Sequence, residues 1–176
     1  MSHYNAVFSA PPGRIGIRVT AERVARIDRL DGGPDHPPDH PLAGEAVRQI
    51  AAWLDDPRQR FDLPLAPAAT AFQHRLREAL LELPPGTVVA YGELARRLGS
   101  SARAVGAGCG ANPLPLVVPC HRVVAAHGIG GYGRERGAGA AIAYKRWLLA
   151  REGVPVDALQ RRVRAGPTQT ESRRQG

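Results

Sequence analysis

Cysteines, aromatic residues and long apolar runs are all scarce in this chain of 176 residues. Its two cysteines, Cys109 and Cys120, are too few for a disulfide framework, so we expect a reducing, cytoplasmic setting. No run approaches the roughly 18 consecutive apolar residues of a membrane span, and residues 1–10 lack the pattern of a secretory signal. We therefore expect neither a membrane protein nor a disulfide-stabilised secreted protein.

Glycine and proline are abundant, because 20 glycines and 16 prolines indicate short elements joined by many turns. The net charge of +8 is distributed unevenly along the chain. Residues 1–65 contain 8 basic and 9 acidic residues, whereas residues 66–176 contain 16 basic and 7 acidic residues. A basic C-terminal part suggests a polyanionic partner such as nucleic acid, and the alternative is a solvated basic surface.

The hydrophobic pattern predicts an N-terminal α/β domain over residues 1–66. Apolar residues alternate over residues 4–30, on both sides of a Pro11-Pro12-Gly13 turn, which predicts short strands. Residues 42–54 have the apolar spacing of one helix. Pro64 and Pro67 then interrupt the pattern and mark the domain boundary.

A second domain is predicted over residues 67–153, followed by a basic and disordered tail over residues 154–176. The periodicity predicts helices in this second domain over 71–83, 91–98, 102–110 and 140–152. The two short helices in the middle are separated by a turn that contains Gly99, which is the outline of a helix-turn-helix.

The helix predicted over 102–110 has almost no large side chains. Ala102, Ala104 and Gly106 are small, and Arg103 is the one long polar residue. Such a helix suits the minor groove of DNA, which is roughly 6 Å wide, and Arg103 can fill the place of a base that has left the stack. The alternative is a helix packed tightly inside the protein, with Arg103 in a salt bridge.

The clearest chemical signal is the segment Pro119-Cys120-His121-Arg122-Val123. A free thiol has a pKa of about 8.5, so Cys120 needs a base at neutral pH. His121 can be that base through a bridging water, because adjacent side chains usually point apart. Glu152 shares the core-facing side of the last helix and is the candidate that orients His121. A structural Cys-His pair is the alternative, and Cys109 is expected to be a small core residue.

Five segments in this order resemble the O6-alkylguanine-DNA alkyltransferases, the methylated-DNA–protein-cysteine methyltransferase family. They are Tyr91–Ala95, Ala102–Gly106, Asn112–Pro115, Pro119–Val123 and Lys145–Gly153. The resemblance is loose before Leu65 and close from Thr70 onward. It implies an α+β chain, in which a small ribonuclease-H-like domain precedes a helical, winged-helix-type DNA-binding domain that carries the cysteine.

The resemblance also implies the function. The protein would flip O6-alkylguanine, and also O4-alkylthymine, out of duplex DNA and transfer the alkyl group irreversibly to Cys120. It would act once per molecule, as a monomer, without a cofactor or a metal. Base chemistry of this kind requires extrusion of the base, at a cost of a few kcal/mol.

Each residue that matches the family pattern acquires an implied role. Catalysis would involve Cys120 as acceptor, His121 as base, Glu152 as its orienting group and Asn112 as a brace of the surrounding turn. The substrate would contact Tyr91, the carbonyls of Cys120 and Val123, Pro115, Tyr132 and the backbone N–H of Gly133. The DNA would contact Ala102, Arg103, Ala104 and Gly106.

Two features leave alternatives open. The glycine-rich loop after Tyr132 is longer than is usual in the family, and we expect residues 133–139 to close over the pocket or contact a phosphate; the alternative is a solvated insertion. His36 and His40 are metal-ligand candidates, but a solvated loop is the favoured interpretation there.

Two rival functions remain at this point. One is a non-enzymatic alkyltransferase-like protein that binds lesions, although such proteins have another residue in place of Cys120. The other is a cysteine hydrolase, which typically takes its histidine from a distant segment.

Overall fold

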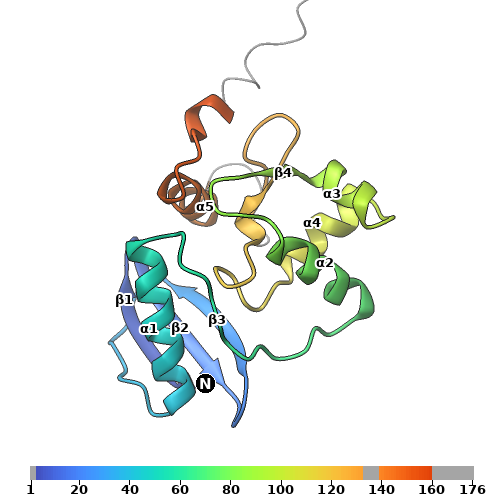
Figure 1. The fold of residues 1–176 in the computed structure, drawn as a ribbon. Helices are drawn as coiled ribbons and strands as arrows, with labels where there is room; N and C mark the ends of the chain where they lie inside the picture. The colour runs from blue at the N-terminus through green and yellow to red at the C-terminus, as the bar shows by residue number, and fades with distance from the viewer. Residues whose placement is uncertain (1–2, 133–138, 160–176) are drawn as a thin grey trace, which may run out of the picture.

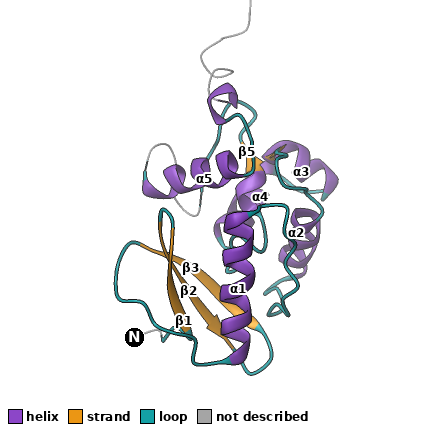
Figure 2. Ribbon diagram, turned by 60° about the vertical axis from the view of Figure 1, so that its left-hand side comes forward, coloured by secondary structure: helices purple, strands orange, loops and turns teal. Residues whose placement is uncertain are grey.

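The computed structural model describes residues 3–132 and 139–159. Its N-terminal part is an antiparallel sheet in the order β1 (Ala6–Ala10), β2 (Gly13–Val19) and β3 (Val24–Leu30). Helix α1 (Pro41–Asp55) covers one face of this sheet (Figures 1 and 2). The predicted strands, turn and helix are confirmed.

The sequence explains the position of α1. The Nδ1 atom of His40 accepts the N–H of Leu42 at 3.1 Å and so caps the helix, and Pro41 follows at the first helical position. Apolar residues at helical spacing then face inward; the buried ones are Ala43, Ala46, Ile50, Trp53 and Leu54.

The C-terminal part is built mainly from helices α2 (Ala71–Leu81), α3 (Tyr91–Arg97), α4 (Ala102–Gly110) and α5 (Ala140–Arg151). All four were predicted, with boundaries that differ by a few residues. The hydroxyl of Thr70 caps α2 by accepting the N–H of Gln73 at 3.1 Å. Helix α2 ends at Leu81 rather than residue 83, just before Pro84 and Pro85.

A short parallel pair of strands brings Tyr91 and the Cys120 segment together. Strand β4 (Val89–Ala90) pairs with β5 (Val123–Val124), which directly follows the 3-10 turn η1 (Cys120–Arg122). Because α3 begins immediately after β4, this pairing brings Tyr91 beside the Cys120 segment.

The two halves of the chain share one hydrophobic cluster, which contains residues of β1 to β3, α1, α2, α3, α4 and α5. The N–H of Ile27 in β3 also donates to the carbonyl of Pro113 at 2.9 Å. The boundary near residue 66 therefore separates two structural units that pack on each other, and their division into domains stays a prediction.

The packed structure extends beyond the expected end of the second domain. Val154 and Val156 are buried and pack in a second cluster with Ile142 and Leu149. Residues 154–159 therefore belong with the C-terminal part, whereas the sequence assigned them to the tail. The rest of that tail and residues 133–138 lie outside the described residues.

None of the helices in the described ranges has the length and apolar character needed to cross a bilayer.

Candidate active site

Cys120 is buried at the first position of η1, where Asn112 holds it. The side-chain amide of Asn112 donates to the carbonyl of Val118 at 3.0 Å and to Sγ of Cys120 at 3.2 Å. Its Oδ1 accepts the N–H of Leu114 at 3.0 Å. One side chain thus closes the turn over residues 112–118 and fixes the thiol at its end.

This turn contains an unusual backbone conformation. Leu116 is buried and has a φ of +73°, a region that residues with a side chain rarely adopt. Such a conformation costs on the order of 1–3 kcal/mol and persists only where surrounding contacts determine it. Here the Asn112 bonds at the ends of the turn and the burial of Leu116 supply those contacts.

His121 is fully buried, and its Nε2 lies 2.7 Å from Oε1 of Glu152. A carboxylate only accepts hydrogen bonds, so Nε2 carries the proton of the neutral ring and Nδ1 is left as a base. Nδ1 is buried and has no hydrogen-bond partner within the described residues. Burial lowers the pKa of His121, against the opposing effect of Glu152, so the ring is neutral at physiological pH.

Glu152 is saturated with donors. Besides His121, the guanidinium of Arg122 donates from Nη2 to Oε1 at 2.7 Å and from Nε to Oε2 at 3.0 Å, and the N–H of Gly86 donates to Oε2 at 3.1 Å. Burial by itself raises the pKa of Glu152, but the bonds from His121 and Arg122 outweigh it and lower the pKa to about 2. The carboxylate is therefore charged at any physiological pH.

Opposing effects act on the thiol of Cys120. Burial raises its pKa, whereas the amide of Asn112 and the ammonium group of Lys145 lower it. Because burial prevails, the resting group is a thiol, and its proton must be removed before it can react.

Lys145 is a buried cation at the site for which the sequence suggested no role. Its Nζ donates to the carbonyls of Val123 at 2.6 Å, Ile129 at 2.9 Å and Gly131 at 2.9 Å, and it lies 5.5 Å from the centre of the Tyr91 ring. Burial lowers its pKa to about 8. Its position in the segment 145–153 was visible in the sequence, but its direction, inward from a helix, was not.

Of the expected substrate residues, Tyr91 contacts this lysine, and Tyr132 directly follows Gly131, whose carbonyl the lysine binds. The hydroxyl of Tyr91 donates to the carbonyl of Gly131 at 3.2 Å, and burial raises its pKa. The hydroxyl of Tyr132 is buried near Cys120, and burial raises its pKa, with Cys120 adding to the shift. Pro115 is half-buried, and Gly133 lies outside the described residues.

Helix α4 has two different faces. Ser101 caps it by accepting the N–H of Ala104 at 3.1 Å, and Ala102 and Arg103 are exposed. Arg103 has no ion pair or hydrogen bond with any described residue, so none of these residues forms the salt bridge of the alternative interpretation. Gly108, however, packs against α2, where an added Cβ would lie 2.5 Å from Cδ2 of Leu76.

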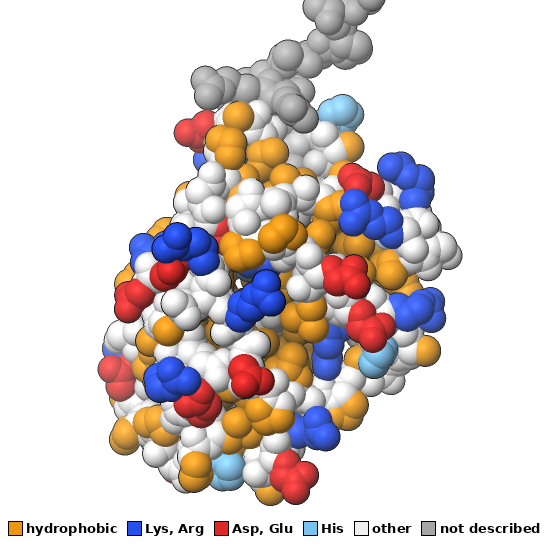
Figure 3. All heavy atoms as spheres, viewed as in Figure 1, with side chains coloured by type: hydrophobic (Ala, Val, Ile, Leu, Met, Phe, Trp, Pro, Cys, Tyr) orange, Lys and Arg blue, Asp and Glu red, His pale blue; other side chains and the backbone are white. Residues whose placement is uncertain are grey.

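The basic excess does not form one patch on the face that Figure 3 shows. Lysine and arginine side chains alternate there with acidic side chains. On this face the charge distribution favours the solvated-surface alternative.

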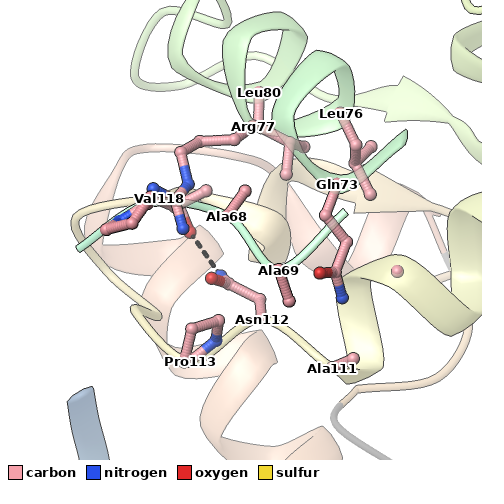
Figure 4. Close-up of a pocket in the computed structure, with 12 residues that line it drawn as sticks. Ala68, Ala69, Gln73, Leu76, Arg77, Leu80, Ala111, Asn112, Pro113 and Val118 are labelled. Carbon is pink, nitrogen blue, oxygen red and sulfur yellow. Dashed lines mark hydrogen bonds between the residues drawn. The ribbon is translucent and has the colours of Figure 1, made fainter. Parts of the chain in front are cut away.

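Behind Asn112 lies a cavity of about 270 Å³ between α2 and residues 67–69 (Figure 4). Gln73, Leu76, Arg77, Ala111 and Val118 are among its lining residues. Asn112 also lines this cavity, whereas Cys120, Tyr91 and Tyr132 are not among its described lining residues. The cavity is therefore separate from the group of residues around the thiol.

Fold and site together define a class of protein, in which a buried cysteine with a His–Glu pair stands beside two short helices of helix-turn-helix outline. The family model described as the DNA-binding domain of 6-O-methylguanine DNA methyltransferase matches residues 71–154. The methylated-DNA–protein-cysteine methyltransferase of Methanosarcina acetivorans is 34% identical over 158 residues, which cover 85% of this chain and 98% of that protein. This chain belongs to the methylated-DNA–protein-cysteine methyltransferase family.

Solved structures agree with this membership. The crystal structure of Mycobacterium tuberculosis O6-methylguanine methyltransferase has a TM-score of 0.70 and 33% identity, covering 85% of this chain and 92% of that chain. A structure of the Mycobacterium tuberculosis protein in complex with DNA has a TM-score of 0.70 and 32% identity, covering 88% of this chain and 96% of that chain. The mixed α/β fold is therefore that of the family.

Proposed function

We propose that the protein repairs alkylated DNA directly, by transferring the alkyl group from O6 of guanine to Sγ of Cys120. The observation that carries the proposal is the buried chain of contacts from the thiol segment through His121 to Glu152, in which Nδ1 of His121 is left without a partner. That nitrogen is the base that the thiol lacks. The family membership and the DNA complex of a relative support the same function.

The reaction follows from these residues. Nδ1 of His121, through a water molecule, takes the thiol proton, and Glu152 stabilises the resulting imidazolium. The thiolate attacks the alkyl carbon, a carbon–sulfur bond forms, and the carbon–oxygen bond breaks with its electron pair left on guanine O6. The proton that His121 took from the thiol passes to the purine, so the products are guanine, a thioether on Cys120 and a neutral His121. No group at the site reverses thioether formation, so each molecule acts once.

Other residues bind and orient the flipped base. Tyr91 keeps its proton because its pKa is raised, and it donates a hydrogen bond to the guanine. The carbonyls of Cys120 and Val123 accept from the guanine amino group, although Val123 already accepts from Lys145 at 2.6 Å. Pro115 and Tyr132 line the alkyl pocket, and Gly133 supplies a backbone donor to O6.

Helix α4 binds the minor groove of a DNA duplex that contains O6-alkylguanine. Ala102 and Arg103 are exposed on this helix, Ala104 and Gly106 are half-buried beside them, and Arg103 fills the vacated stack. The protein acts as a monomer and must work where the genome lies, inside the cell. In the same proposal the sheet with α1 is a ribonuclease-H-like domain and the C-terminal part is of winged-helix type.

A turnover measurement tests this function. With methyl-labelled O6-methylguanine duplex in excess, we expect the transferred methyl groups to level off at one per protein. Cys109→Ser should behave as the parent, whereas Cys120→Ser should bind DNA and transfer nothing. Several methyl groups per molecule, or transfer by Cys120→Ser, would refute the proposal. A lesion-binding protein without transfer activity predicts no labelled protein at all.

A further inference from the structure

Three side chains from two segments of the N-terminal part gather around one point. Nε2 of His36 lies 3.4 Å from Oδ2 of Asp39, and Nε2 of His3 lies 3.8 Å from the same oxygen. The three donor atoms lie within 4.8 Å of one another, and the two imidazole rings meet edge to face with centroids 5.4 Å apart. Two imidazoles and one carboxylate form a donor set that suits zinc.

Bonds from the sheet hold two of these donors in place. The other carboxylate oxygen of Asp39, Oδ1, accepts the amide of Asn5 at 3.0 Å, so Oδ2 remains for a ligand. The backbone of His36 exchanges two hydrogen bonds with Val7, both of 2.9 Å. Such second partners orient ligands in metal sites.

Two of the three donor pairs are close to the spacing that zinc requires. Ligands at zinc distances in a tetrahedral arrangement lie about 3.3–3.5 Å from one another. The His36–Asp39 pair already has this separation, and the His3–Asp39 distance of 3.8 Å closes by a small rotation of an exposed side chain. The N–H of Asp39 donates to the carbonyl of Asn5 at 3.0 Å, so the segment of His3 already lies beside the loop that leads into α1.

The structure changes the candidates that the sequence suggested. His40, paired there with His36, caps α1 through Nδ1 and is not part of the cluster. His3 is the second histidine of the cluster instead. It lies 33 positions before His36 in the chain, and only the folded sheet brings the two side chains together.

We propose that His3, His36 and Asp39 bind one zinc ion, with water in the remaining position. The ion joins the segment before β1 to the loop before α1 and thereby stabilises the N-terminal part. None of the three residues belongs to the proposed alkyl-transfer machinery, so zinc raises stability and leaves transfer unchanged.

Calorimetric titration of the chelator-stripped full chain with zinc chloride tests this site. We expect one zinc ion per chain and a rise in the melting temperature with zinc concentration. His3→Gln, His36→Gln and Asp39→Asn should each weaken binding at least about tenfold. His74→Gln is the matched control and should bind zinc as the parent does. His74 pairs with Glu78 at 3.3 Å on the exposed side of α2, and it belongs to no such cluster in the described residues.

Two results would overturn the zinc site. One is the absence of saturable binding with zinc up to about 100 μM, a concentration that corresponds to about 5.5 kcal/mol of binding free energy. The other is equal binding by the parent and His3→Gln, which would assign the ion to other groups such as the two cysteines. Either result would leave the proposed alkyl transfer untouched, because that proposal is tested on Cys120.

Discussion

Among single residues, Glu152 connects the most parts of the site. It accepts hydrogen bonds from His121, from Arg122 and from the backbone of Gly86. A carboxylate offers about four acceptor positions, and here they are all in use. The proton on Nε2 of His121 is therefore fixed, and the opposite nitrogen is the one available for base catalysis.

The lowered pKa of Glu152 makes a prediction about stability. Its value falls from 4.5 to about 2 in the fold, so as pH decreases the unfolded chain takes up this proton first. The stabilisation is complete above pH 4.5 and is lost as pH falls toward 2, by about 3 kcal/mol in all. We expect the free energy of unfolding in urea to fall by about 3 kcal/mol more for the parent than for Glu152→Gln between pH 4.5 and pH 2.

The control for that measurement is Glu45→Gln. Glu45 also forms hydrogen bonds with an arginine, Arg48, but the pair lies on the exposed side of α1, where solvent screens it. Exposed pairs contribute little, so this variant should keep the slope of the parent. Equal slopes for the parent and Glu152→Gln would contradict the proposed charge state of the buried carboxylate.

Among the secondary-structure elements, helix α4 has one face that packs on α2 and one face that is open to solvent. The face that carries Gly108 packs on α2, and the face that carries Arg103 is open to solvent. The small residues of this helix thus have two separate causes. The internal-packing alternative is right for Gly108, and the exposed face remains for the proposed DNA contact.

A pair of alanine variants separates these causes. Gly108→Ala should destabilise the fold by about 1–3 kcal/mol, because its Cβ would overlap Leu76 in a packed interface. Gly106→Ala should be neutral or stabilising by about 0.5–1 kcal/mol, because its Cβ finds ordinary contact with Tyr91 at 4.0 Å. Denaturant unfolding measures both. Equal losses would show that the helix does not distinguish its two faces in this way.

The exposed face makes its own prediction. Arg103→Ala should slow alkyl transfer from duplex DNA by about tenfold or more. A tenfold change corresponds to the loss of roughly 1.4 kcal/mol of stabilisation of the flipped state. Transfer from free O6-alkylguanine base should be unchanged, because no base has to leave a stack. Arg75→Ala, another exposed arginine but on α2, serves as the control. Equal losses on both substrates would exclude a role in base extrusion.

Over the whole molecule, the two halves meet at the site itself. The Trp53 ring of α1 lies edge-on to the His121 ring with centroids 6.1 Å apart, and the guanidinium of Arg151 donates to the carbonyl of Leu54. The N-terminal part therefore forms one wall of the pocket that buries the catalytic histidine. Its contact with the ring contributes to the burial of His121.

This shared interface predicts that the halves unfold together. The chain has two tryptophans, Trp53 in the N-terminal part and Trp147 in α5, so single-tryptophan variants report on each half separately. Trp147→Phe and Trp53→Phe should each show one fluorescence transition, and each midpoint should agree with circular dichroism of the same variant. A transition of either tryptophan that is separate from the circular dichroism would indicate two independently stable domains.

The sequence predicted local structure well and spatial neighbours incompletely. Periodicity and caps such as Thr70 identified the strands and helices, and Glu152 was found because it shares a helix side with the core residues Leu148 and Leu149. Lys145 and the contact of Trp53 with His121 were missed, because both depend on how distant elements pack. The same reason explains why the sequence grouped His36 with His40, whereas in the fold His36 lies beside His3.

The most direct test of the account is the mass of the protein after reaction. After incubation with a duplex that contains O6-methylguanine, the intact chain should gain the mass of one methyl group, and peptide mapping should place it on Cys120. The His121→Ala variant should gain the same group at a rate about 10²–10⁴-fold lower, because it lacks the base. A methyl group on Cys109, or an unchanged mass, would contradict the central claim.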